Sequence, residues 1–302
     1  VLKAPDVDER VYIGAQFHEL VLVSDPVYPQ FIIDLAVVLP GEHSSSKYAV
    51  LISGGWTPQD AWPSFWNDLK MVYSVLVEEY FYDPVNIYVL YNDGVGEDSQ
   101  IPVHYAATTD KVSLVLDELA DIMDSGDRLL FYATDHGGWY GDGGKEPTAA
   151  STDLDEYICL WNKGGYYDDW LDEKLDAINY SKAIIILDLC HSGGFTWDLS
   201  GDDRIIMTAC KEAELSYDHP DAPNGDFTYN LFNALRGYWW AYADLDNNGR
   251  VSVAEAFNYA AANSISIQTA TYDDNGDGVA HFNNIPNGGP VEDEGRLGNT
   301  YL

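Results

Sequence analysis

This 302-residue sequence is poor in cysteine, in basic side chains and in long apolar runs. Its three cysteines, Cys159, Cys190 and Cys210, are too few for a disulfide framework, and the odd number leaves at least one thiol unpaired within the chain. A bridge between Cys159 and Cys210 stays open. No apolar run approaches the roughly 18 residues of a membrane-spanning helix, and the run at 31–39 contains Asp34, so we expect no membrane span.

Basic residues are the second shortage, because 15 lysines and arginines face 50 aspartates and glutamates and the formal charge is −35. A surface this negative repels nucleic acid phosphates, which excludes DNA and RNA as partners. Three uses of the charge remain open: solubility in salt, attraction of cationic substrates, and binding of hard cations such as calcium. The acids are scattered along the chain, which favours a solvated acidic surface for most of them.

What the sequence does have is globular composition, with 46% hydrophobic and 14% aromatic residues, and enough length for a large core. Short apolar runs alternate with amphipathic stretches. The expected strands are 47–55, 85–93, 127–139, 182–189 and 204–210, and the expected helices are 63–82, 108–123, 171–178, 227–243 and 252–263. This alternation predicts an α/β fold with a mostly parallel sheet between two layers of helices. In such sheets function lies beyond the carboxyl ends of the strands.

Two of these strands end in a reactive side chain followed by glycines. His136 precedes Gly137 and Gly138 after the third strand, and Cys190 precedes His-Ser-Gly-Gly after the fourth. Because adjacent parallel strands lie about 4.8 Å apart, the two side chains can approach each other. An imidazole beside a thiol helps to form the nucleophilic thiolate, and glycine amides suit an oxyanion. Each residue alone is more often structural, but together they predict a catalytic dyad of His136 and Cys190, with the amides of Gly137 and Cys190 as the oxyanion hole.

The segments FYATDHGG and IIILDLCHSGGF resemble the histidine and cysteine blocks of the caspase-like cysteine peptidases, which include legumains, caspases, metacaspases, clostripain-like enzymes and gingipains. The 54 residues from His136 to Cys190 are close to the spacing typical of caspases. AVLISGGW, VLYNDG and YATDHGG are similar, in this order, to strand ends of the legumain-like branch. The resemblance covers residues 47–237. It implies a caspase-like three-layer α/β/α sandwich and a cysteine endopeptidase that cleaves proteins or peptides through an acyl-enzyme.

Two features of legumains are missing from the sequence. The asparagine that orients their catalytic histidine is replaced by Gly54, and their substrate-binding arginine has no counterpart in WTPQDAWPSFW. Asp188 lies two residues before Cys190 on the same strand face and matches the acid that selects arginine or lysine in clostripain-like relatives. The resemblance therefore implies a basic P1 residue, the residue just before the cut bond. Alternatively, Asp188 pairs with the backbone or with Lys182 and does not contact the substrate. Legumains also carry an acid at this position, yet they prefer Asn at P1.

The segment DLDNNGRVSVAE fits the calcium loop of an EF-hand, with glycine at its sixth position and helices expected on both sides. The residues at its ligand positions are Asp244, Asp246, Asn248, Arg250 (through its carbonyl) and Glu255. A second segment, DDNGDGVAHFNN, places Asp273, Asn275 and Asp277 similarly, but Asn284 stands where a bidentate acid is needed. This second segment is either a turn or a calcium site completed by a distant acid.

The sequence thus predicts an N-terminal β extension (1–46), a catalytic domain (47–237) and a C-terminal EF-hand-like segment (238–302) packed on it. We expect calcium to be structural or activating, with no organic cofactor, and extracellular calcium levels favour a secreted or cell-envelope protein. The polar loop at 140–156 is a candidate cleavage site of a zymogen or a rim of the active site. Two alternatives remain: a legumain-like transpeptidase or ligase with Asn or Asp at P1, and a catalytically dead, calcium-dependent surface binding module.

Overall fold

In the computed structural model of the chain, the residues that the structure describes are 45–140, 156–237, 242–282 and 297–302. The chain divides into two compact units, residues 1–43 and 44–302, and all described residues belong to the second. The expected N-terminal β extension (1–46) therefore lies outside the described residues except for positions 45 and 46. The polar loop (140–156) lies outside them except for its two end positions, 140 and 156.

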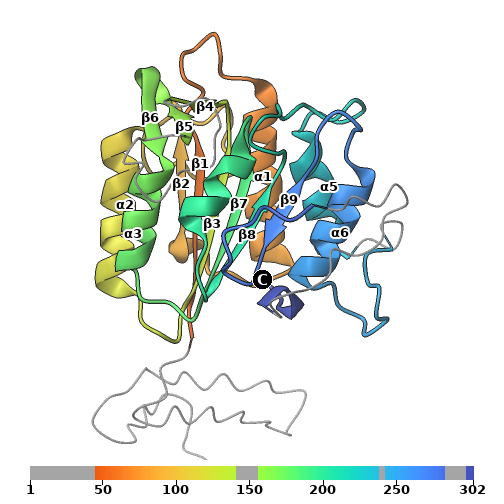
Figure 1. The fold of residues 1–302 in the computed structure, drawn as a ribbon. Helices are drawn as coiled ribbons and strands as arrows, with labels where there is room; N and C mark the ends of the chain where they lie inside the picture. Colours follow the sequence, from red (N-terminus) through yellow and green to blue (C-terminus); the bar gives the residue numbers. More distant parts are fainter. Residues whose placement is uncertain (1–44, 141–155, 238–241, 283–296) are drawn as a thin grey trace, which may run out of the picture. The chain divides into compact units, whose positions relative to one another are not determined.

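A six-stranded sheet forms the middle layer, in the order β2-β1-β3-β7-β8-β9 (Figure 1). Its strands are β1 (Lys47–Ser53), β2 (Ile87–Tyr91), β3 (Arg128–Thr134), β7 (Lys182–Asp188), β8 (Arg204–Thr208) and β9 (Thr271–Asp273). The first five are parallel, and β9 runs antiparallel to β8. The apolar runs of β1, β3 and β7 are buried almost throughout, as expected for strands covered on both faces. The predicted α/β fold with a mostly parallel central sheet is confirmed.

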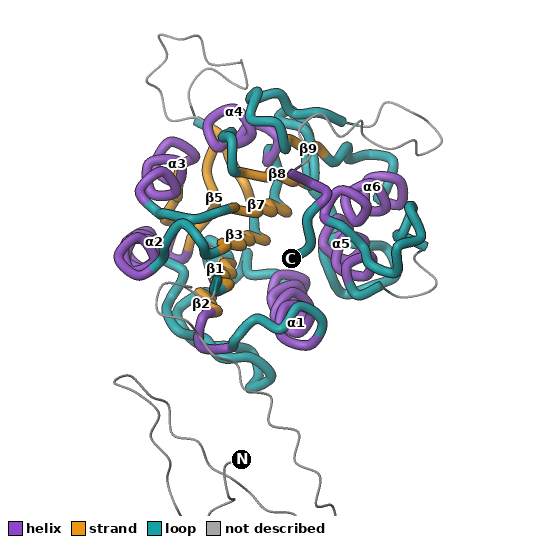
Figure 2. The backbone as a smooth tube through the Cα atoms, turned by 90° about the horizontal axis from the view of Figure 1, so that it is seen from below, coloured by secondary structure: helices purple, strands orange, loops and turns teal. Residues whose placement is uncertain are grey.

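Helices cover both faces of this sheet and complete a three-layer sandwich (Figure 2). One layer contains α1 (Pro63–Glu78), α5 (Asp226–Leu235) and α6 (Val253–Asn263), and the other contains α2 (Thr109–Ile122), α3 (Asp168–Ala177) and α4 (Phe195–Leu199). Successive residues of β1 point to opposite layers: Ala49 and Leu51 belong to the first core, Val50 and Ile52 to the second.

Short 3-10 turns lie at Pro84–Asn86, Trp161–Lys163, Ser192–Gly194 and Leu297–Asn299. No described helix has both the length and the apolar character to cross a membrane.

A second, antiparallel sheet of three strands lies above the carboxyl ends of the main strands in Figure 1. It consists of β4 (Gly137–Trp139), β5 (Glu156–Leu160) and β6 (Gly164–Tyr167). The stretch 127–139, predicted as a single strand, is therefore two strands in different sheets. The chain turns at Asp135 because its carboxylate binds amides of the neighbouring β1 end and the amide of His136.

The helix predicted at 227–243 is shorter than expected, since α5 ends at Leu235. Gly237 has φ of +66° and its amide donates to Ala234 O, which is how glycine commonly terminates a helix. The candidate calcium loop at 244–255 is thus followed by a helix, α6, but α5 does not run into it as an EF-hand helix would. Within residues 238–302, α6 packs in the first core and β9 extends the main sheet.

Candidate active site

The register of the sheet brings the two candidate catalytic residues to one edge. Thr134 of β3 pairs with Asp188 of β7, and His136 and Cys190 each follow two residues later. The amide of Asp135 donates to Asp188 O at 3.3 Å, so the two chains stay together beyond the last strand residues. Both side chains are half-buried. The predicted meeting point at the carboxyl edge of the sheet is thus the place where the two chain segments run side by side.

The hydrogen bond of the His136 ring defines which nitrogen can act as a base. Nε2 lies 2.9 Å from the main-chain carbonyl oxygen of Asp60. A carbonyl oxygen only accepts, so Nε2 carries the proton of the neutral ring. Nδ1 then keeps its lone pair and is the atom able to take a proton from a thiol.

The Cys190 thiol lies among backbone groups. Its Sγ–H donates to Ser216 O at 3.8 Å. Burial raises the pKa of the thiol and the charge of Asp188 adds to this, while backbone hydrogen bonds involving Ser216, Gly137 and Cys190 itself oppose the rise. Among the described residues, the Cys190 thiol and the His136 ring have different hydrogen-bond partners, Ser216 O and Asp60 O, and these bonds do not join the two side chains to each other.

The amides expected to bind an oxyanion lie around the same sulfur. Gly137 and Cys190 both contribute backbone hydrogen bonds that favour the ionised thiol. Gly137 also lies close to the Cys190 main chain, because a Cβ added at Gly137 would be 3.0 Å from Cys190 C and 2.9 Å from a methyl carbon of Leu189. Glycine is therefore required at this place.

Asp135 is a residue that sequence reasoning missed, although it directly precedes His136. Its carboxylate accepts hydrogen bonds from Ser53 Oγ (3.3 Å), from the amides of Gly54 and Gly55 (2.7 Å for Gly55), and from the His136 amide (2.6 Å). Burial raises the pKa of Asp135 to about 7, although the three amides favour the ionised form. The side chain joins the end of β1 to the start of the histidine loop. An acid between a buried strand and the histidine was the available sequence signal.

The structure explains why the asparagine of legumains is replaced by Gly54. A Cβ at this position would lie 2.6 Å from Trp161 N, so an asparagine side chain has no room without moving the end of β5. The orienting hydrogen bond for His136 comes instead from the Asp60 carbonyl, six residues later in the same loop. The turn that presents this carbonyl is held by the amides of Asp60 and Ala61, which donate to Thr57 O.

Asp188 lies beneath Cys190 and is 4% exposed. Ser216 Oγ donates to it at 2.5 Å, and Thr228 donates through its amide (3.0 Å) and hydroxyl (2.7 Å). Among the described residues no basic side chain pairs with Asp188, so the predicted alternative with Lys182 is not seen, whereas a backbone partner is. Burial raises the pKa of Asp188.

A second buried acid, Asp68 of α1, lies next to Asp188 and was not predicted. It is 0% exposed and accepts hydrogen bonds from Thr134 Oγ1 (2.8 Å), Asn224 Nδ2 (2.8 Å) and the Gly225 amide (3.1 Å). Burial raises the pKa of Asp68 well above its usual range, and the negative charge of Asp188 adds to the rise. Two neighbouring buried carboxyls that no basic side chain pairs with, among the described residues, form a site to which a positive charge is attracted.

The other cysteines remain free: Cys159 and Cys210 are buried and form no disulfide. The bridge left open by the sequence is absent here.

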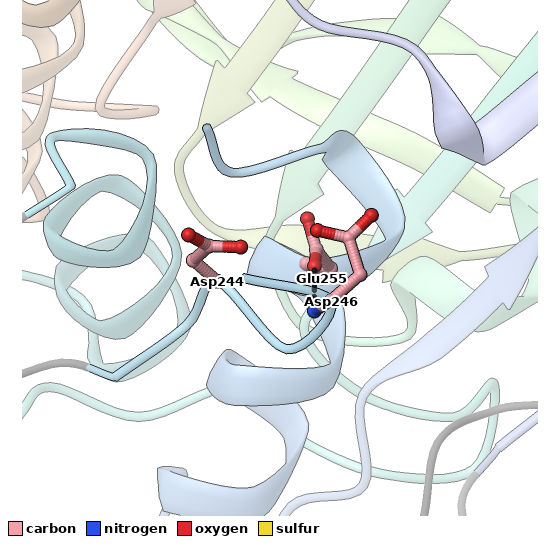
Figure 3. Close-up of side chains that lie close together, drawn as sticks. All are labelled: Asp244, Asp246 and Glu255. Atoms are coloured by element: carbon pink, nitrogen blue, oxygen red, sulfur yellow. Dashed lines mark hydrogen bonds between the residues drawn. The ribbon is translucent and has the colours of Figure 1, made fainter. Parts of the chain in front are cut away.

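The first calcium loop gathers its acids on one side of the turn (Figure 3). Carboxylate oxygens of Asp244, Asp246 and Glu255 all lie within 4.8 Å of one another. Asp244 accepts hydrogen bonds from the amides of Asn248 (3.1 Å) and Gly249 (2.9 Å), and Gly249 has φ of +85°. Asn248 and the Arg250 carbonyl remain predicted ligands. This donor set of hard oxygens at a tight turn suits calcium.

The second acidic segment is arranged differently. Asp273 accepts a hydrogen bond from Ser200 Oγ at 2.7 Å, and Asp277 lies 3.3 Å from His281 Nε2. Asn275 donates through its side chain to Asp277 at 3.1 Å. In the described part of the chain these residues do not form a group of three acidic ligand atoms, and Asn284 lies outside it. Calcium binding at this segment remains a prediction.

The comparisons with known proteins agree with this arrangement. A family model described as the Peptidase C13 family matches residues 120–277, which include both His136 and Cys190. This confirms the legumain-like resemblance of the sequence. No curated protein matches the chain. A crystal structure of protein GSU0716 from Geobacter sulfurreducens is similar over 76% of this chain and 92% of its own, with 17% sequence identity and a TM-score of 0.53. At that identity the likeness shows the fold alone.

Proposed function

Because the chain belongs to the peptidase C13 family, we propose that it is a cysteine endopeptidase in which Cys190 is the nucleophile and His136 carries the protons. The observation that carries the proposal is the register of β3 and β7, which ends both catalytic segments at one edge of the sheet. The half-buried thiol, the free Nδ1 of His136 and the nearby glycine amides support the same chemistry.

The reaction follows from these groups. His136 Nδ1 takes the proton of Cys190 Sγ, and the thiolate attacks the carbonyl carbon of the scissile bond. The amides of Gly137 and Cys190 bind the negative oxygen of the tetrahedral intermediate. His136 then gives its proton to the leaving amine, which leaves a thioester on Cys190. Water, deprotonated by the same histidine, hydrolyses the thioester and restores the thiol.

We propose a preference for arginine or lysine at P1, with Asp188 and Asp68 as the acids that attract this side chain. Support comes from the absence of a basic partner for either acid in the described chain, and from the overall charge of −35. Both acids are buried. The substrate side chain must therefore displace donors of the 216–228 segment, such as Ser216, to reach Asp188.

We further propose that the loop at 244–255 binds one calcium ion that stabilises the fold. Three carboxylates within 4.8 Å repel one another unless a cation lies between them. A loop of this kind is filled most readily at extracellular calcium levels, which supports a secreted or cell-envelope location.

The decisive experiment is digestion of a mixed peptide pool by the wild type and by Cys190→Ala, each with calcium and with a chelator. We expect cleavage after arginine and lysine, and no cleavage by Cys190→Ala. Equal cleavage by the alanine variant would exclude the mechanism, whereas cleavage only after Asn or Asp would exclude the proposed P1 preference. Adding a peptide amine to the reaction tests the ligase alternative, because a ligase joins that amine to the acyl fragment. Failure of an active-site probe to label Cys190 would favour a dead binding module.

A further inference from the structure

We propose that Trp62 and Phe65, at the start of α1, are positioning residues that hold the catalytic imidazole of His136 in one orientation. This inference rests on the proposed function, in which His136 acts through Nδ1. The two ring centroids lie 5.1 Å (Trp62) and 5.2 Å (Phe65) from that of His136, and both rings stand nearly perpendicular to the imidazole, at 87° and 86°. Together with the Asp60 carbonyl they form what we call the histidine clamp.

The sequence of the clamp explains its geometry. Trp62 is followed by Pro63, which restricts the tryptophan to extended backbone (φ −84°, ψ 144°) and begins the helix. Phe65 comes three residues after Trp62, at a spacing that brings side chains to the same side of a helix start. Their rings are indeed parallel to within 7° at a centroid distance of 6.1 Å. Six consecutive residues, 60–65, thus supply one hydrogen bond and two rings to the same imidazole.

The consequence for catalysis concerns rotation of the ring. A half-turn about the Cβ–Cγ bond of His136 would replace Nδ1 by a carbon atom and break the bond to Asp60 O. Perpendicular aromatic contacts are favourable, and here they come from two side chains at once. Trp62 is nevertheless 46% exposed, far more than core packing requires, whereas Phe65 is 7% exposed. Trp62 can therefore be replaced with little risk to folding, which makes it the residue to test.

The first readout is steady-state kinetics. We expect Trp62→Leu to lower kcat about tenfold with KM nearly unchanged, since misplaced catalytic groups slow the chemical step. Trp62→Phe keeps an aromatic ring and should recover most of the activity. Trp170→Leu, at a tryptophan of α3 that is 37% exposed, is the matched control and should behave as wild type. Unchanged kcat in Trp62→Leu, or equal losses in the leucine and phenylalanine variants, would overturn the clamp.

The second readout needs no peptidase activity and therefore separates failure of the clamp from failure of the proposed function. Iodoacetamide alkylation of Cys190 at pH 7 depends on an imidazole able to take its proton, whereas near pH 10 hydroxide can take the proton instead. Trp62→Leu should slow alkylation several-fold at pH 7 and leave it unchanged near pH 10. In a His136→Ala background, the Trp62 substitution should have no further effect. An equal slowing in that background would show that Trp62 acts on the fold and not on His136.

Discussion

Gly137 lies directly against the main chain of Cys190, so closely that any side chain at 137 would overlap the Cys190 carbonyl group. This contact joins the histidine loop to the cysteine loop. It also brings the Gly137 amide to the sulfur, where it favours the ionised thiol. The glycine after the proposed catalytic histidine therefore has two requirements to meet at once, close packing and a free amide.

Replacing Gly137 by alanine should abolish activity. The added Cβ would force β4 away from Cys190 and displace one donor of the proposed oxyanion hole, and loss of one such donor costs about 100-fold or more in kcat. Thermal unfolding should show a folded protein with a modestly lower Tm. Gly126→Ala is the control, because a Cβ there meets only the side chain of Asp124, at 3.2 Å. Wild-type kcat in Gly137→Ala would refute the assigned role.

Asp135→Asn should impair both stability and catalysis. The carboxylate accepts four hydrogen bonds, and an amide would place two donors among those donors. We expect a loss of about 2 kcal/mol in the free energy of unfolding, the range for buried groups left unsatisfied. Urea titration and kcat/KM measure the two effects. Asp93→Asn is the comparison, since Asp93 also follows a strand but is exposed and accepts the Val95 amide. Equal effects of both substitutions would argue against the role of Asp135 in joining the end of β1 to the histidine loop.

Much of this site could be anticipated from local patterns. Apolar runs that end in His136 and Cys190 were sufficient to predict neighbouring parallel strands and a shared edge. The same local reasoning missed Asp135 and Asp68, because their partners are distant in the sequence: Gly54 is 81 residues from Asp135, and Asn224 is 156 residues from Asp68. Only the assembled fold brings these groups together.

The errors in element boundaries have an equally physical origin. The apolar pattern after Leu235 continues through Gly237, so periodicity alone extended the helix to 243, whereas the left-handed backbone of the glycine ends it. The strand predicted at 127–139 continued through Asp135. The alternation of apolar and polar residues does not reveal that the buried carboxylate of Asp135 accepts the amide of His136 and turns the chain there.

The stability of the protein should decrease as the pH rises from about 4 to 7. Burial raises the pKa of Asp135 to about 7 from an ordinary 3.8, and that of Asp168 to about 6. A raised carboxyl pKa means that the folded state holds the proton more tightly, so the stabilisation is complete below pH 4 and is lost as the pH passes the folded pKa. Each carboxyl that titrates contributes up to about 1.4 kcal/mol per pH unit.

Urea unfolding of Cys190→Ala between pH 4 and 8 measures this dependence without self-cleavage. The Asp135→Asn substitution in the same background should flatten the slope near pH 6. Stability that increases with pH across this window would contradict the assignment.

Asp188→Asn should change P1 preference more than it changes overall activity. If Asp188 and Asp68 attract a basic side chain, neutralising either acid should reduce kcat/KM for an arginine peptide by about tenfold or more, as for loss of a buried charged partner. An otherwise identical peptide with Asn at P1 should lose little. The ratio of the two kcat/KM values is the measurement, because it cancels damage to the fold. The same ratio in wild type, Asp188→Asn and Asp68→Asn would exclude the acid pair from substrate recognition.

Glu255→Gln separates the two roles of this side chain, helix capping and metal binding. Glu255 accepts hydrogen bonds from the amide (2.8 Å) and hydroxyl (2.9 Å) of Ser252, which together cap the start of α6. Glutamine can serve in the same capping box, but it cannot supply the bidentate negative charge that a calcium ion needs at this position. Glu255 also accepts hydrogen bonds from the amides of Leu245 and Asp246, which the amide group of glutamine would face with a donor, so the chelated variant should unfold at a somewhat lower Tm than the chelated wild type. Calcium should raise the Tm of the wild type by several degrees and leave the Tm of the variant unchanged. A ligand stabilises a fold only when it binds the folded state, and the variant should not bind calcium. Asn247→Ala, at an exposed loop position that carries no proposed ligand, should keep the full calcium response. A wild type whose Tm is the same with calcium and with chelator would show that the carboxylates of Asp244, Asp246 and Glu255 only accept hydrogen bonds of the turn and do not hold a metal.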